Sequence, residues 1–116
     1  MKVIKCLYGR PSMLGEVNGY NDMCDFVGGY IEGYYPFDDD VAIVCNEEGK
    51  IIGLPMNRFI HDKNGRVREI ICGDFFICGV GEDDFTDIPE ELIDKYMQLM
   101  DDEIVGLYGV IANYKR

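Results

Sequence analysis

The chain has 116 residues, of which 47% are hydrophobic and 12% aromatic, and its formal net charge at pH 7 is −11. This length and apolar content suit one compact domain over residues 1–116, built around one hydrophobic core. The negative charge disfavours direct binding to nucleic-acid backbones or anionic membranes, and no apolar run reaches the roughly 20 residues needed to cross a bilayer.

The first part of the chain predicts two strands and a short helix. Residues 3–8 and 13–17 flank a Gly-Arg-Pro-Ser turn signal and have the composition of strands. The helix is expected to begin at an N-cap around Asn21 and to end at Gly28, because glycine tolerates the left-handed conformation that closes many helices.

The middle of the chain is typical of short strands and tight turns. Residues 30–37 form an aromatic-rich strand, and residues 41–45 form a continuous apolar run that predicts a buried strand. The sequence Asn-Glu-Glu-Gly at 46–49 resembles a hairpin turn, so residues 50–54 are expected to return as the second strand of that hairpin.

A second hairpin signal follows a proline. Residues 56–61 are expected to be a helical turn or irregular, whereas the Asn-Gly pair within 62–65 strongly predicts a hairpin turn. Residues 66–72 and 74–80 are apolar enough to form one long strand region, bent or bulged at Gly73.

The clearest helix signal lies near the end of the chain. Asp87 is a candidate N-cap, and the apolar residues of 88–102 recur every three or four positions. Residues 104–111 repeat this spacing and predict a short C-terminal helix, although two glycines weaken it. The predicted fold is therefore α+β: a mostly antiparallel sheet with one main amphipathic helix and one or two short helices.

Five cysteines, an odd number, occur mainly inside apolar runs. Free cysteine often packs as a small buried hydrophobe, so the sequence predicts thiols rather than disulfides. The first residues have no apolar core typical of a signal peptide. These features favour a reduced, cytoplasmic setting.

An ordered set of motifs resembles a family of small bacterial, phage and mobile-element proteins that is known only as a domain of unknown function. The motifs run from about residue 28 to residue 96: Gly-Gly-Tyr-Ile-Glu, Val-Ala-Ile-Val-Cys-Asn-Glu-Glu-Gly-Lys, Gly-Leu-Pro-Met-Asn-Arg, Gly-Asp-Phe-Phe-Ile and Gly-Glu-Asp-Asp-Phe-Thr. The resemblance implies a compact stand-alone domain in a phage-like or mobile-element setting, and it implies no enzyme activity.

Basic residues are concentrated after the proline, in contrast to the acidic chain as a whole. Asn57, Arg58, His61, Arg66 and Arg68 fall in this segment and are the candidate ligand-binding residues. The planar guanidinium group suits carboxylate or phosphate, which indicates a site for a nucleotide or another anion. Alternatively, Arg58 pairs with an acidic neighbour and the other basic side chains are solvated.

Two candidate interaction surfaces emerge from the same sequence. One is the aromatic segment with Tyr34 and Tyr35, since tyrosine combines apolar area with a hydroxyl group. The other is the acidic face of the helix, which could attract a basic partner or imitate the charges of DNA, or could simply face solvent. Its candidate residues are Glu90, Glu91, Asp94, Asp101 and Asp102.

Three functional classes remain open. The first is a non-catalytic protein-interaction module, whose partner is a protein such as a basic one, or a second copy paired through an exposed edge strand. The second is a small-anion binding protein. The third, an enzyme using Asp74 or Glu32 with His61, is the weakest, because no catalytic constellation is recognisable and neither a metal nor a cofactor is predicted.

Overall fold

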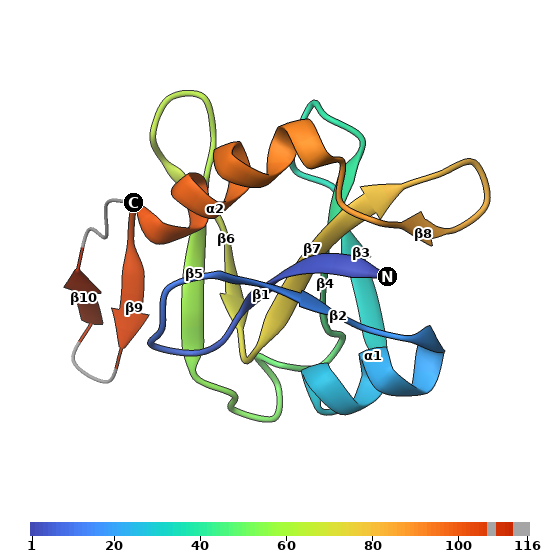
Figure 1. Ribbon diagram of the computed structural model, residues 1–116. Helices are drawn as coiled ribbons and strands as arrows, with labels where there is room; N and C mark the ends of the chain where they lie inside the picture. Colours follow the sequence, from blue (N-terminus) through green and yellow to red (C-terminus); the bar gives the residue numbers. More distant parts are fainter. Residues whose placement is uncertain (107–108, 113–116) are drawn as a thin grey trace.

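The computed structural model describes residues 1–106 and 109–112 (Figure 1). In this part of the chain the elements are, in order, β1 (Lys2–Cys6), β2 (Met13–Glu16), α1 (Gly19–Val27), β3 (Ile31–Tyr34), β4 (Val41–Asn46), β5 (Met56–His61), β6 (Val67–Cys72), β7 (Phe75–Val80), β8 (Phe85–Thr86), a 3₁₀ turn (Glu90–Leu92), α2 (Ile93–Asp101), β9 (Ile104–Gly106) and β10 (Gly109–Ala112).

The main sheet has the order β2–β1–β7–β4–β3, with β8 paired to the end of β7, and β5–β6 and β9–β10 form separate hairpins. The strand pairs are antiparallel. These arrangements confirm the predicted α+β class with a mostly antiparallel sheet.

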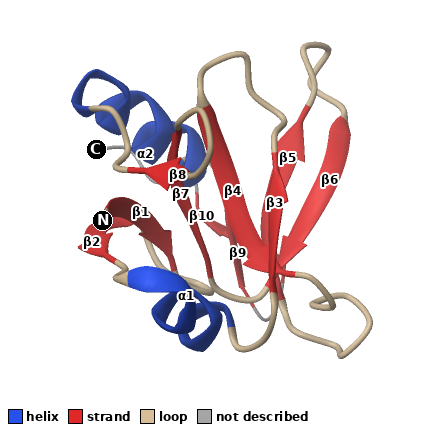
Figure 2. Cartoon of the chain, turned by 90° about the vertical axis from the view of Figure 1, so that its right-hand side faces the viewer, coloured by secondary structure: helices blue, strands red, loops and turns tan. Residues whose placement is uncertain are grey.

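Both faces of the main sheet are covered, which explains the continuous apolar run of β4. Ile43 packs on one face with residues of α2 and the β5–β6 hairpin, and Val44 packs on the other face with residues of α1. Successive side chains of a strand point to opposite faces, so a strand buried on both faces needs apolar residues at every position. Figure 2 shows the two helices on different sides of the strands.

Several predicted elements are confirmed by the structure. The first two strands pair as a hairpin, and residues 41–46 form the buried strand β4. Helix α1 ends at Gly28, whose φ of 80° is left-handed as expected, but the helix begins earlier than predicted, at Gly19. The Asp-Lys-Asn-Gly turn joins β5 to β6.

The prediction for residues 50–54 was wrong. The Ile52 amide donates to Glu48 O at 3.0 Å and the Leu54 amide donates to Gly49 O at 2.9 Å, so the chain curls into successive turns instead of forming a strand. Strand β4 instead pairs with β3 and β7. β3 directly precedes β4 in the chain, and β7 lies about thirty residues after it, so the turn signal at 46–49 pointed to the wrong partner.

The prediction that residues 56–61 are helical or irregular was also wrong, because this segment is strand β5. Its pairing with β6 is irregular, however: Met56 is opposite Cys72 and Arg58 is opposite Ile71, which leaves Asn57 as an extra residue in a bulge. Gly73, with φ of 82°, separates β6 from β7 so sharply that the expected single long strand becomes two strands in different sheets.

The C-terminal predictions need two corrections. Asp87 does not cap α2, since its Oδ1 accepts a hydrogen bond from the Lys2 amide at 2.9 Å, and a 3₁₀ turn precedes the helix. Residues 104–106 and 109–112 form an antiparallel hairpin instead of a helix, beside β5, which agrees with their β-branched residues. Leu107 and Tyr108 of the expected helix lie outside the described residues.

Across the described residues, none of the helices combines the length and apolarity needed to span a membrane.

Candidate functional site

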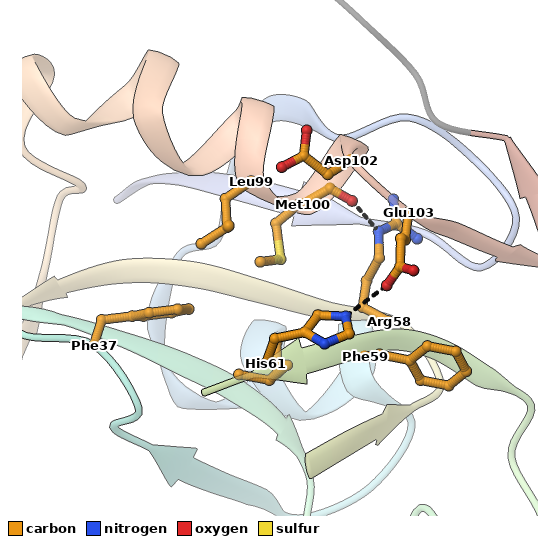
Figure 3. A pocket seen from close by; sticks show the side chains of 9 residues that line it. Phe37, Arg58, Phe59, His61, Leu99, Met100, Asp102 and Glu103 are labelled. Atoms are coloured by element: carbon orange, nitrogen blue, oxygen red, sulfur yellow. Dashed lines mark hydrogen bonds and ion pairs between the residues drawn. The ribbon is translucent and has the colours of Figure 1, made fainter. Parts of the chain in front are cut away.

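A cavity of about 150 Å³ opens between the C-terminal end of α2 and strand β5 (Figure 3). We call it the α2–β5 pocket. Phe37, Phe59, Leu99 and Met100 provide most of its apolar lining. Its polar lining comes from Arg58, His61, Asp102 and Glu103. The pocket thus combines an apolar interior with ionisable groups, the usual composition of a binding site.

Contacts with α2 hold the Phe37 wall in place. The rings of Phe37 and Tyr96 lie 4.8 Å apart between centroids. Two residues later in the chain, Asp39 Oδ2 accepts hydrogen bonds from the Tyr96 hydroxyl at 2.6 Å and from Lys95 Nζ at 2.7 Å. These bonds lower the pKa of Asp39, whereas burial and the Asp39 contact raise the pKa of Tyr96. The loop before β4 is therefore anchored to the helix.

Arg58 lies at the inner side of the pocket and is only 1% exposed. Its Nε donates to Met100 O at 2.7 Å, and one terminal nitrogen donates to Arg10 O at 2.6 Å. The other terminal nitrogen donates to Asn57 O at 3.1 Å and to Asn57 Oδ1 at 2.6 Å. Burial lowers the pKa of Arg58, and nearby Asp101 opposes this shift.

Asn57 is fully buried, as its place in the β5 bulge permits. Its Nδ2 donates to Cys6 O and to Gly73 O, each at 2.8 Å. Asn57 and Arg58 together join β5 to β1, to the β6–β7 corner and to the end of α2. The protein oxygens thus take up the donors that an anion would need, which favours the alternative in which Arg58 pairs inside the protein.

Asp101 was a candidate surface residue, and this placement was wrong: Asp101 is 0% exposed. Its Oδ1 accepts a hydrogen bond from the Ser12 amide at 2.7 Å, and Oδ2 accepts one from the Ser12 hydroxyl at 3.0 Å. A terminal nitrogen of Arg58 lies 3.9 Å from Oδ1. A buried carboxylate needs such partners, because burying a charge without them is costly.

His61 forms the mouth of the pocket with Glu103. The His61 Nε2 and Glu103 Oε1 atoms are 2.6 Å apart, and Nδ1 lies 3.1 Å from Gly65 O. Both ring nitrogens thus face oxygen acceptors, an arrangement that suits the doubly protonated imidazolium form. The Glu103 contact raises the pKa of His61, and the Gly65 carbonyl adds to this effect. Figure 3 shows the Glu103 carboxylate pointing toward the ring.

Exposed acidic residues lie on α2 and at its two ends, and we call them the acidic face of α2. Glu91, Asp94 and Asp102 are exposed, and within the described residues no ion pair joins them to a basic side chain. Glu90 is exposed but pairs with Lys2 at 3.0 Å. Leu99, on the same helix, is 43% exposed and also lines the pocket. With Asp101 buried and Glu90 paired, the acidic row is shorter than the sequence suggested.

The remaining candidates lie elsewhere. Arg66 and Arg68 are exposed and do not line the α2–β5 pocket; Arg68 donates to Pro36 O at 3.5 Å. Tyr34 is half-buried and lines a different hollow, between β3 and β6. Tyr35 is 58% exposed and lines a third hollow, beside the β7–β8 loop. The structure therefore brings Arg58, His61 and Asp102 together at the pocket, with Asn57 and Asp101 buried beside Arg58, and places the other candidates away from this pocket.

Sequence reasoning missed most of the pocket walls. Phe37, Phe59 and Glu103 come from three separate segments, and no local pattern links them. The three-to-four spacing of apolar residues predicts that Leu99 lies on the buried face of the helix, but its side chain is 43% exposed. Its exposure beside acidic residues is visible only once α2 is placed against β5.

Burial affects the chemistry of several cysteine thiols. None of the five cysteines, all of which lie in the described residues, forms a disulfide. Burial raises the pKa of Cys45 to about 11 and that of Cys78 to about 12, which disfavours the reactive thiolate. In residues 1–106 and 109–112, no group of three or more His, Cys, Asp or Glu side chains is arranged to hold a metal ion.

Comparison with known proteins gives one match. The model of a family described as Domain of unknown function (DUF3846) matches residues 1–101, so the chain belongs to that family. No curated protein and no solved structure matches the chain.

Proposed function

We propose that this member of a family of unknown function is a non-catalytic protein-interaction module that binds a basic segment of a partner protein. The α2–β5 pocket would accept an apolar side chain of that segment, and the acidic face of α2 would hold its lysines or arginines. The observation that carries the proposal is that Leu99 lines the pocket and is also exposed on α2, and that the acidic Asp102 lines the same pocket.

The physical argument combines two contributions. Burying an apolar side chain in the pocket supplies affinity in proportion to the area removed from water. Exposed carboxylates add attraction at long range and so speed encounter with a basic partner, although each exposed pair contributes little affinity. An apolar anchor with charged surroundings is a common arrangement in protein interfaces.

Several properties of the chain support a binding role over catalysis. His61 contacts Glu103, but no nucleophile is placed beside this pair among the pocket residues. Five cysteines without a disulfide fit a reduced, cytoplasmic setting. A phage or mobile-element protein of this kind would use a basic segment of a host protein as its partner.

The test uses a short fluorescent peptide in which a central leucine pair is flanked by lysines and arginines. Binding is measured by fluorescence anisotropy for the wild type and for the double variant Leu99→Gln/Asp94→Lys. We expect the variant to bind about tenfold more weakly, a change of about 1.4 kcal/mol. Control peptides replace the leucines with serine or the basic residues with glutamate.

A matched control keeps the same change of charge away from the site. Asp83 is exposed in the β7–β8 loop, so Asp83→Lys alters the net charge of the protein as Asp94→Lys does. At moderate ionic strength this control should change the affinity less than about twofold, because distant surface charges are screened. Equal loss in the Asp83→Lys and the Leu99→Gln/Asp94→Lys proteins would refute the proposed site.

A further inference from the structure

Large apolar side chains are exposed at the end of the molecule that carries α1. Tyr20 is 56% exposed, Tyr30 69% and Ile52 55%. They come from α1, from the turn before β3 and from the loop after β4, and they line two adjoining hollows that share Tyr30 and the Gly28–Gly29 turn. We call Tyr20, Tyr30 and Ile52 the tyrosine patch. In Figure 1, α1 and α2 lie on opposite sides of the strands, so this surface is separate from the α2–β5 pocket.

Hydrogen bonds hold the backbone beneath the tyrosine patch in a defined shape. The Glu47 amide donates to Tyr30 O at 2.9 Å, and the Ile52 amide donates to Glu48 O at 3.0 Å. Buried Asn46 links the two segments: its Nδ2 donates to Val27 O at 3.2 Å, and its Oδ1 accepts a hydrogen bond from the Glu48 amide at 2.8 Å. The patch is thus presented by an ordered platform, which limits the entropy lost when a partner binds.

The charges around the patch are of one sign. Asp25, Glu47 and Glu48 are exposed and line the two hollows. In the described ranges no ion pair joins any of them to a basic side chain, and the nearby Lys50 is paired with Glu69. A second copy of this chain, also with net charge −11, would bring like charges together at this surface.

We infer that the tyrosine patch is a second docking surface, and that its occupant is an arginine-containing segment of another protein with an apolar side chain beside the arginine. Tyrosine rings attract guanidinium groups placed over their faces, and Ile52 offers apolar contact. The carboxylates of Asp25, Glu47 and Glu48 can pair with the guanidinium. This surface does not depend on the function proposed for the α2–β5 pocket.

The experiment isolates the patch by first disabling the other surface. The labelled peptide with leucines flanked by lysines and arginines is titrated by anisotropy into Leu99→Gln/Asp94→Lys protein. The same titration is then made with Tyr30→Ser and Ile52→Asn added to that background. Leu14→Asn, which changes an exposed apolar side chain on β2, is added in a parallel protein as the matched control. Circular dichroism confirms that each protein is folded.

We expect measurable binding in the Leu99→Gln/Asp94→Lys background, an affinity at least about tenfold weaker after Tyr30→Ser/Ile52→Asn, and little change after Leu14→Asn. Replacing the arginines of the peptide with lysines should also weaken binding, since lysine lacks the planar group that stacks on tyrosine. The inference is overturned if the background protein does not bind the peptide, or if binding survives removal of Tyr30 and Ile52. If the Leu99→Gln/Asp94→Lys change itself has no effect, the α2–β5 proposal fails, while the comparison of patch variants still decides this one.

Discussion

Arg58 and His61 are three residues apart on β5, yet the structure gives them opposite environments. Arg58 is 1% exposed and donates to oxygens from three parts of the fold, whereas the His61 side chain is 37% exposed and contacts Glu103 at the pocket mouth. A cluster of basic residues in sequence therefore need not form one site. Here burial separates a stabilising cluster from a surface available to ligands.

The largest effect that this comparison predicts is the loss of Arg58. Arg58→Met removes the donors to Met100 O and Arg10 O and leaves Asp101 without the guanidinium beside it. Disrupting a buried charged cluster in this way should lower the free energy of unfolding by about 3–5 kcal/mol, as measured by urea denaturation. Arg66→Ala is the control, since Arg66 is exposed. Equal stability of the two variants would contradict the buried role of Arg58.

A smaller loss of stability is expected at the bulge. Asn57→Ala leaves Cys6 O and Gly73 O without their donor and removes one acceptor from Arg58. Unsatisfied buried groups cost about 1–3 kcal/mol each, so we expect a loss of roughly 2–3 kcal/mol in the same urea experiment. Asn21→Ala, on the exposed side of α1, should change stability by less than about 0.5 kcal/mol.

For the exposed Leu99 we expect the reverse: little change in stability and weaker peptide binding. Leu99→Gln should alter the free energy of unfolding by less than about 0.5 kcal/mol, because Leu99 is half exposed and glutamine is a good helix former. The same change should weaken peptide binding several-fold. If it instead destabilised the protein as strongly as Asn57→Ala, Leu99 would belong to the core and not to a binding surface.

The smallest effect on stability concerns His61, and it depends on pH. The folded-state pKa of His61 is raised by Glu103, so its stabilising contribution is present below the unfolded value of about 6.5 and disappears as pH rises through the folded pKa. Both groups are partly exposed, so the contribution should stay below about 1 kcal/mol. His61 is the one histidine of the chain, so its ring signal can be followed by proton NMR without assignment.

We expect the midpoint of this titration to lie above the ordinary histidine value and to fall in Glu103→Gln. The difference in unfolding free energy between wild type and His61→Gln should shrink as pH rises. An unshifted midpoint in the wild type, or the same midpoint in Glu103→Gln, would show that the contact does not persist in solution.

Elements that depend on neighbouring residues could be predicted from the sequence, and elements that depend on distant contacts could not. Helix α1 with its Gly28 stop, the buried strand β4 and the Asn-Gly turn depend on neighbouring residues, and these were predicted. Strand β5 was not, because Asn57 and Arg58 look like surface residues until distant carbonyl groups accept their hydrogen bonds. The loop after β4 was mistaken for a strand, because β4 pairs with the preceding strand β3 and with the distant β7 and not with the residues that follow it.

The same distinction applies to the candidate site. The acidic character of α2 could be read from its residues, but Asp101 faces inward because Ser12 and Arg58 surround it. The pocket itself joins residues 37, 58–61 and 99–103. Only tertiary packing brings these segments together, so no spacing rule could have predicted it.

The α2–β5 pocket and the adjacent helix face are proposed to bind a basic segment with an apolar anchor. The most direct test is a ¹H–¹⁵N NMR titration of the wild-type protein with the leucine-containing basic peptide, in which amide shifts are mapped onto the structure. We expect saturable shifts at Phe37, at Phe59 to His61 and at Leu99 to Glu103, and none there with the peptide that has serine in place of leucine. Saturable binding that leaves these amides unshifted would contradict this proposal.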